Sequence, residues 1–575
     1  MEKIVKKIKP IHILIAILAL AFILRFWNIT KVPVSLFGDE VDLGYQAYSF
    51  LKTGKDYSGN ILPLHFNSLA EWRTPLYLYS AVPTVALFGI SPYGVRLPAV
   101  IFGVLGIWAF YLLVKELFKS EKLALLSALV LTFSPWHFQY SRAGFEVTEL
   151  LFFLMLGLYF FFKGLKNGKW MWLAAVCFCL TPWIYSTAKL FTPFLIVFLT
   201  LVWRKEIFSL PRRQLVYTAI AGLIVGVPIA FSTMFGGGTA RFDYIGIFTD
   251  PTIESEVGFA RQRDALMRGE TQIGVNPTII DRLLHNKFTI IGTVITRNYF
   301  QALGADYLFN TGDPNSRHSI QEIGQFYKLE AIPLVAGLFL FFVKTKNKRL
   351  KALIGFWILA GVLPSALTRD GGTHSTRLIL ILPPLVILIS YGIVEGIKLV
   401  KKNYRKYLVL VYGAVWVVSI IFFLHGYFVH NPWDNERMWH YGFKEAISAM
   451  KEVEGNYSKV IISTYSEPPW IFFAGFYPYP PAKWHEGYPF KKTEVKGFGN
   501  VSYIDKYYFG TASVAGEGVY GFGKLLDKNT LYVATANEVK VDLIHEPERT
   551  PGDLKLIKAI AYPSGAPAFY IFSGR

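Results

Sequence analysis

The chain carries twelve apolar runs between residues 10 and 425, each about as long as an α-helix must be to cross a bilayer. The bilayer core offers no hydrogen-bond partners to the backbone, so runs of this length must be helical. We therefore predict an α-helical polytopic membrane protein. The runs cover residues 10–27, 75–90, 95–117, 122–140, 146–163, 169–184, 188–203, 215–233, 329–344, 350–366, 377–397 and 406–425.

Basic residues gather in short loops between these runs, and such loops are typical of the cytoplasmic side. If all twelve runs crossed the membrane, every one of these loops would lie outside. The run 75–90, which contains Pro75 and Pro83, is the best candidate for a helix that lies at the interface. Eleven spans and a cytoplasmic N-terminus then place every basic cluster inside. The net charge of +19 thus reflects the orientation of the chain in the membrane rather than nucleic-acid binding.

The topology divides the chain into two predicted domains. Residues 1–428 form the membrane domain, with outer loops at 28–94 and 234–328. Residues 429–575 are more polar and alternate strand-like and helical stretches, so we expect an extracytoplasmic α/β domain there. No small-residue cleavage site follows the run 10–27, which is therefore expected to be a retained span.

An acidic pair, Asp39-Glu40, follows the first span on the outer side of the membrane. A carboxylate there can act as a general base. The stretch after it has a helical pattern that includes Tyr45 and ends at Gly54, so Asp39 can equally serve as a helix cap. Both roles remain open for Asp39.

Charged residues also mark the other outer segments. Arg73 precedes the interfacial run and can bind either a phosphate or lipid headgroups. Arg142 lies at the next outer turn, near Glu146 and Glu149, which share one helix face. These residues can face a cavity, or Arg142 can simply pair with Glu146.

Further cations lie on the outer side, although basic residues favour cytoplasmic loops. Binding of an anionic lipid headgroup would require cations there. They are Lys189, Arg317, His318, His374 and Arg377. The outer histidines lack the spacing of a zinc site. The two cysteines, Cys177 and Cys179, lie inside one apolar run and are expected to be packing residues.

The motifs in this order resemble the GT-C glycosyltransferases that use polyprenyl-phosphate sugars, in the branch of the protein O-mannosyltransferases and aminoarabinose (lipid A) transferases. The resemblance rests on Asp39-Glu40, on the segment 73–77, on 88–98, on Ser141-Arg142 with Glu146, and on 368–377. The chain departs from the pattern at Arg73, where the aminoarabinose branch tends to have lysine, and at Glu146, where relatives often have aspartate.

The resemblance implies a GT-C fold and an inverting transfer in which Asp39 deprotonates the acceptor, with Glu40 beside it, while basic groups stabilise the departing lipid phosphate. Such cations could replace a divalent metal, so no obligatory metal or other cofactor is predicted. We expect donor contacts from Arg73, Arg142, Lys189, Arg317, His318, His374 and Arg377, and acceptor-binding or orienting roles for Glu146, Glu149 and Tyr45.

The expected partners are membrane lipids, a polyprenyl-phosphate sugar as donor, and a glycan, lipid or protein as acceptor. The expected location is the plasma membrane of a prokaryote. A transporter or flippase of lipid-linked sugars is the main alternative, and a ligase with a diphosphate-linked donor is another. A transporter would be expected to show broken helices and charges deep within its spans, whereas here the charges gather at the outer ends.

Overall fold

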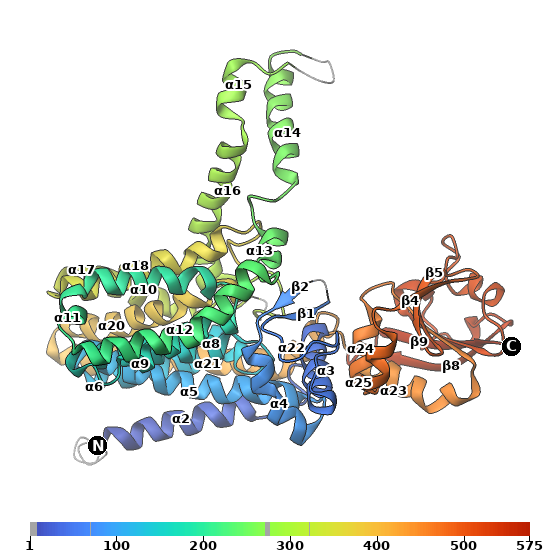
Figure 1. Cartoon of the computed structure of the whole chain (residues 1–575), viewed down its shortest axis with the longest axis horizontal. Helices are drawn as coiled ribbons and strands as arrows, with labels where there is room; N and C mark the ends of the chain where they lie inside the picture. Colours follow the sequence, from blue (N-terminus) through green and yellow to red (C-terminus); the bar gives the residue numbers. More distant parts are fainter. Residues whose placement is uncertain (1–8, 70, 271–275, 321) are drawn as a thin grey trace.

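The computed structural model describes residues 9–69, 71–270, 276–320 and 322–575. A body of long helices carries a sheet-containing C-terminal region at one end, and a helical hairpin rises from the side of the body (Figure 1). The helices of the body are α2 (Pro10–Phe26), α3 (Gly38–Thr53), α4 (Leu76–Phe88), α5 (Pro92–Phe118), α6 (Glu121–Phe133), α7 (Pro135–Tyr140), α8 (Val147–Asn167), α9 (Met171–Ile184), α10 (Ala188–Val202), α11 (Arg204–Phe208), α12 (Arg212–Phe235), α13 (Ala240–Ile245), α17 (Ala331–Lys344), α18 (Lys348–Ala366), α19 (Ser375–Leu378), α20 (Leu382–Leu399), α21 (Lys402–His425) and α22 (Asn431–Asp434).

The apolar runs fold into helices, as their length predicts. Within the described residues, six helical segments are long and apolar enough to cross a membrane: Pro92–Phe118, Val147–Asn167, Arg212–Phe235, Lys348–Ala366, Ser375–Leu399 and Lys402–Asp434. Helices α2, α4, α9 and α10 are apolar but shorter. The protein is thus a multi-pass membrane protein, and the exact number of eleven spans stays a prediction.

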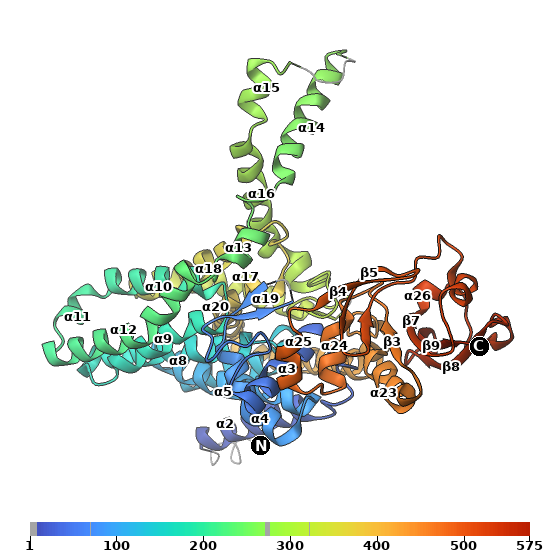
Figure 2. The ribbon, with the colours of Figure 1, turned by 45° about the vertical axis from the view of Figure 1, so that its right-hand side comes forward.

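The hairpin that rises from the body belongs to the expected outer loop 234–328. It consists of α14 (Thr252–Met267), α15 (Ile279–Leu284) and α16 (Lys287–Ala302). It stands clear of the body in both views (Figures 1 and 2).

Helix α3 is the element that presents the acidic pair. Its first residue, Gly38, follows Phe37, whose side chain makes no capping hydrogen bond. Asp39 therefore lies in the first turn rather than at the cap position, where a carboxylate still interacts favourably with the helix dipole. The helix ends at Gly54, whose φ of 72° is the left-handed conformation predicted for this glycine.

The C-terminal region contains a seven-stranded mixed sheet with the order β4-β5-β6-β3-β7-β9-β8. Strand β3 lies between β6 and β7 and is parallel to both, while the remaining pairs are antiparallel. The strands are β3 (Lys459–Ile462), β4 (Lys491–Val495), β5 (Gly499–Ile504), β6 (Tyr507–Phe509), β7 (Thr530–Thr535), β8 (Leu554–Ala561) and β9 (Pro567–Gly574), and the helices are α23 (Phe443–Val453), α24 (Pro469–Phe476), α25 (Pro481–Gly487) and α26 (Ala536–Val539).

One hydrophobic core joins this region to the helical body. Val41 and Tyr45 of α3 belong to the same buried cluster as Val460 of β3 and Phe473 of α24. Figure 2 shows α3, α24 and α25 side by side at the junction. Because the core is shared, the sheet region helps to hold α3 in place.

Candidate active site

Asp39 forms an ion pair with Arg73 at the end of the helical body that carries the C-terminal region. Arg73 ends β2 (Glu71–Arg73), which pairs with β1 (Phe66–Ser68) in a short hairpin. The Arg73 Nη2 to Asp39 Oδ1 distance is 2.7 Å, and the Asp39 side chain keeps 38% of its surface exposed. The pair orients the carboxylate while leaving it accessible, as a general base requires.

The neighbouring acid, Glu40, has a different environment. Both of its carboxylate oxygens accept hydrogen bonds from Arg96 of α5, at 2.7 and 2.8 Å, and both side chains are completely buried. The backbone N–H of Gly144 donates to the same carboxylate at 2.7 Å. Glu40 thus fastens α3 to α5 and to the turn before α8, and it offers no accessible oxygen to a substrate.

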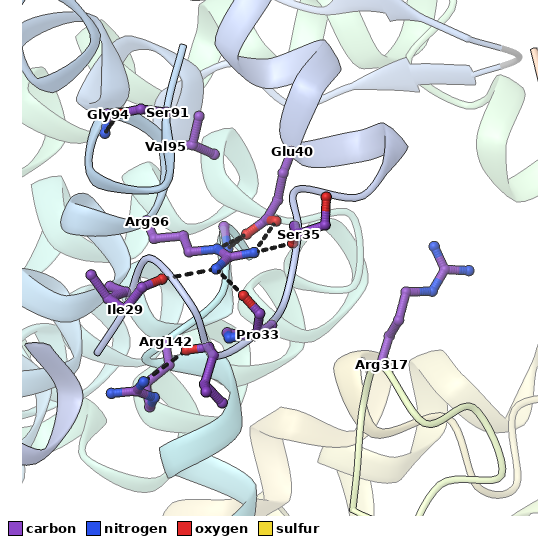
Figure 3. A network of polar contacts seen from close by, with 12 residues as sticks. Ile29, Pro33, Ser35, Glu40, Ser91, Gly94, Val95, Arg96, Arg142 and Arg317 are labelled. Carbon is purple, nitrogen blue, oxygen red and sulfur yellow. Dashed lines mark hydrogen bonds and ion pairs between the residues drawn. The ribbon is translucent and has the colours of Figure 1, made fainter. Parts of the chain in front are cut away.

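Arg96 also holds the loop that leads into α3. Its guanidinium donates to the backbone carbonyls of Ile29, Pro33 and Ser35 at 3.0, 2.9 and 2.5 Å (Figure 3). Charged hydrogen bonds of this kind are strong in a buried environment. The loop that positions Asp39 is therefore anchored along its length.

Arg142, expected near the donor phosphate, lies in a second buried anchor. Its two terminal nitrogens donate to the carbonyls of Leu24, Arg25 and Val32 at 2.7 to 2.8 Å, and its guanidinium lies 4.7 Å from the ring centre of Phe428. Its side chain is 0% exposed. This geometry gives Arg142 a structural role at the end of the first span, and Arg142 forms no ion pair with Glu146 in the described residues.

Glu146 and Glu149, at the start of α8, differ in burial. Glu146 lies at the start of α8 and lines a small cavity of about 20 Å³ with Arg73 and Asp42. Glu149, one turn further along, is buried and accepts a hydrogen bond from Ser80 of α4 at 2.9 Å. Arg73 thus connects Asp39 with the environment of Glu146, while Glu149 joins two helices.

Asp42 is a site residue that the sequence pattern did not single out. Its side chain is 1% exposed and accepts a 2.5 Å hydrogen bond from Ser68 in β1. Burial raises its pKa to about 7, and the nearby charge of Arg73 opposes this shift. A carboxyl group beside the Asp39–Arg73 pair therefore titrates near neutral pH.

Tyr45 does not face this cavity. Its hydroxyl donates to the carbonyl of Tyr479 at 3.0 Å, and its ring packs against Trp484 in the C-terminal region. Burial raises its pKa. Tyr45 is therefore a contact between α3 and the C-terminal region in this structure.

His318 brings two distant outer loops together. Its Nδ1 lies 3.0 Å from the hydroxyl of Tyr140 and 3.2 Å from that of Thr376, and its ring centre is 5.2 Å from that of His374. Burial and the neighbouring charge of Arg317 lower the pKa of His318 to about 3, so it is neutral. His318 also lies within electrostatic range of Asp39.

Lys189 and Arg377 line a cavity of about 280 Å³ where α10 begins and where α12 and α18 end. Arg377 interacts with Asp370 at 2.7 Å and with Thr368 at 2.8 Å. Much of the remaining wall is apolar and includes Leu190, Phe242, Ile245, Pro364 and Leu367. An apolar cavity with two cations suits an amphipathic anion.

His65 is a second residue that sequence reasoning missed, because no spacing links it to the other basic groups. Its Nε2 lies 2.9 Å from the Lys189 ammonium, and its Nδ1 lies 2.7 Å from the hydroxyl of Ser232. Burial and the charge of Lys189 lower its pKa to about 4. A neutral His65 therefore accepts a hydrogen bond from Lys189 and orients it.

The described part of the chain contains no group of three or more His, Cys, Asp or Glu side chains arranged to hold a metal ion. Cys177 and Cys179 are both free thiols, buried and half-buried respectively. The absence of an obligatory metal stays a prediction.

Comparison with known proteins gives one match to a family model and one to a curated relative. Residues 73–231 match the family described as dolichyl-phosphate-mannose-protein mannosyltransferase. The putative mannosyltransferase YkcB of Bacillus subtilis (strain 168) is 32% identical over 92 residues, which is 16% of this chain. The match spans 13% of that relative's length.

Several solved structures have a similar outline. ArnT from Cupriavidus metallidurans bound to undecaprenyl phosphate aligns with a TM-score of 0.49 and 12% identity, covering 97% of each chain. The Archaeoglobus fulgidus oligosaccharyltransferase AglB, in complex with an inhibitory peptide and a dolichol-phosphate, gives 0.49 and 13%, covering 98% of this chain and 74% of AglB. The segment 73–231 is thus similar to the dolichyl-phosphate-mannose-protein mannosyltransferase family, in agreement with the resemblance of its motifs.

Proposed function

We propose that the protein is an inverting glycosyltransferase that moves a sugar from a polyprenyl phosphate to an acceptor hydroxyl on the outer face of the membrane. The observation that carries the proposal is the accessible Asp39 carboxylate, held by Arg73 at 2.7 Å, on a chain whose segment 73–231 matches a lipid-phosphate-sugar transferase family. The location we propose is the plasma membrane of a prokaryote, with a cytoplasmic N-terminus and an outer C-terminal region.

The cavity with Lys189 and Arg377 supports the donor side of this proposal. Its apolar wall suits the first isoprene units, and its two cations suit the phosphate. Lys189 and Arg377 would stabilise the negative charge that develops on the leaving phosphate. Arg317 does not line this cavity, and its guanidinium lies 5.1 Å from the ring centre of Phe37.

Asp39 would remove the proton from the acceptor hydroxyl as the oxygen attacks the anomeric carbon of the sugar. The bond between that carbon and the phosphate oxygen breaks, and its electron pair leaves with the lipid phosphate. Attack from the face opposite the leaving group inverts the configuration at the anomeric carbon. Glu40, Arg96 and Arg142 would act indirectly, by holding the loop and helix that present Asp39.

The test is the release of free polyprenyl phosphate by the purified protein in lipid nanodiscs. A panel of polyprenyl-phosphate sugars that includes mannose is supplied with mixed glycan, lipid and peptide acceptors. We expect release that requires an acceptor and falls at least about 100-fold in Asp39→Asn, which is the scale of general-base catalysis. The matched control, Asp306→Asn, removes an exposed outer carboxylate and should release at the wild-type rate.

Two outcomes would overturn the proposal. One is the absence of release from every donor, with intact lipid-linked sugar found in the opposite leaflet, which indicates a transporter. The other is equal release by Asp39→Asn and the wild type, which would exclude Asp39 as the base.

A further inference from the structure

A second polar cavity lies where the C-terminal region meets the helical body. It has a volume of about 220 Å³. One wall comes from the body and from the segment before α23, with Arg317, Arg437 and His440, and the other comes from the sheet region, with Glu467, Asn537 and Tyr562. The cavity therefore exists only when the two parts are packed together.

The sheet lines the cavity with the carboxyl ends of its parallel strands, where α/β proteins most often bind ligands. Glu467 lies in the loop that follows β3, and Asn537 lies just after β7. These strands are parallel, so both loops emerge at their carboxyl ends. Ligands of open α/β sheets bind in the crevice beyond the carboxyl ends of parallel strands.

The same cavity adjoins the first turn of α3. The Nδ1 of His440 accepts a hydrogen bond from the backbone N–H of Gly38 at 3.2 Å, and its Nε2 lies 3.2 Å from Glu467. On the other side, the Arg317 guanidinium covers the ring of Phe37. Phe37 and Gly38, which make these contacts, directly precede Asp39 in the chain. A ligand in the cavity therefore lies beside the proposed base.

The charges that remain available in the cavity are positive. Within the described residues, neither Arg317 nor Arg437 has an ion pair or a side-chain hydrogen bond, and Arg317 stands apart from the Arg96 network in Figure 3. The Arg437 guanidinium lies 5.5 Å from the ring centre of Tyr562. Glu467, by contrast, is held by His440. Two guanidinium groups with free donors suit a phosphate or a carboxylate.

We propose that this cavity binds the acceptor, and that the unit it recognises is one sugar or polyol unit that carries a phosphate or a carboxylate. The inference rests on the proposed transfer reaction and specifies its acceptor. The volume is below the range of about 300 to 1,000 Å³ that is typical of drug-sized ligands, which fits a single small ring. Tyr562 supplies an aromatic face for the ring, and the two arginines bind its acidic group.

The test measures protection of a thiol from chemical labelling, and it does not depend on turnover. Asn537 is exposed at the cavity and is replaced by cysteine in a background in which Cys177 and Cys179 are changed to alanine. The full-length protein in nanodiscs reacts with a methanethiosulfonate reagent in the presence of glucose 6-phosphate, glucuronate, glucose or inorganic phosphate. The control is Lys528→Cys, which is exposed just before the amino-terminal end of β7, at the opposite end of that strand.

We expect glucose 6-phosphate or glucuronate to slow labelling of Asn537→Cys at least fivefold, and the more effective of the two identifies the acidic group. Glucose and inorganic phosphate should protect much less, and Lys528→Cys should be unaffected. Adding Arg437→Gln should abolish the protection. Equal protection by glucose, or by inorganic phosphate alone, would overturn the proposal.

A second measurement separates this inference from the proposed function. Complete labelling of Asn537→Cys should abolish acceptor-dependent release of polyprenyl phosphate, measured against the rate of the same variant before labelling. If release continues after complete labelling, the transferase assignment stands and the acceptor site lies elsewhere. If the wild-type protein never releases polyprenyl phosphate, the proposed function itself fails.

Discussion

Glu40 and Arg96 form a bidentate ion pair in which neither side chain is exposed. The pair joins the first turn of α3 to α5 (Figure 3). Asp39 directly precedes Glu40 in the chain. A buried guanidinium that loses its carboxylate keeps the cost of desolvation without the compensating attraction. The acidic pair of the sequence thus divides into one accessible and one structural carboxylate.

We expect Glu40→Gln and Arg96→Gln each to destabilise the protein by about 3 to 5 kcal/mol, because each leaves an uncompensated group in the interior. Thermal unfolding of the purified variants measures this loss. Asp39→Asn is the comparison, because its ion pair is partly exposed and should contribute about 1 kcal/mol or less. A Glu40→Gln variant with unchanged unfolding temperature and abolished transfer would instead show that Glu40 takes part in the chemistry.

Lys189→Gln and Arg377→Gln should weaken donor binding. A charge-assisted hydrogen bond contributes about 1.5 to 3 kcal/mol, so each loss should raise the KM for the polyprenyl-phosphate sugar about 10- to 100-fold. Initial rates at varied donor concentration give this value, and unfolding temperatures check that the variants remain folded. Lys169→Gln, in an exposed loop between α8 and α9, is the control. An unchanged donor KM in both cavity variants would place the phosphate elsewhere.

Asp42 predicts a pH-dependent contribution to stability. Burial raises its pKa to about 7 from a usual value of 3.8, so between these values the folded protein holds a proton that the unfolded chain has released. Stability therefore falls as the pH rises from about 4 to about 7. Asp42→Asn should unfold at nearly the wild-type temperature at pH 4 and at a higher temperature than the wild type at pH 8. Equal differences at the two pH values would contradict this.

Two glycines of α20 offer a matched pair for testing helix packing. A methyl group on Gly392 would lie 1.9 Å from the carbonyl oxygen of Pro333 in α17, whereas one on Gly396 meets nothing within 4 Å. Small residues let membrane helices approach closely. Gly392→Ala should therefore destabilise the protein by about 1 to 3 kcal/mol, and Gly396→Ala should be neutral or stabilising by up to about 1 kcal/mol. Unfolding in detergent measures both, and equal effects would refute the close contact.

Sequence reasoning located the charged outer segments but assigned their residues only in part. Adjacent positions on a helix point about 100° apart, so Asp39 and Glu40 could not share one environment. Arg142 looked like a phosphate ligand because it lies at an outer turn, yet its donors are occupied by three backbone carbonyls. No sequence motif marks His440 or Asp42. The role of His440 depends on Gly38, which is remote in the chain, and that of Asp42 depends on its burial.

The sequence by itself determined the helical membrane architecture, because the length and apolarity of each run are local properties. The thickness of the bilayer core and its lack of hydrogen-bond partners require such runs to be helices. The sequence also determined the end of α3 at Gly54 and the strand-like stretches of the C-terminal region. Only the tertiary structure decided which charges meet. Asp39 and Arg73 are 34 residues apart, and Gly38 and His440 are 402 residues apart. Such contacts follow from packing between distant segments, and no local pattern encodes them.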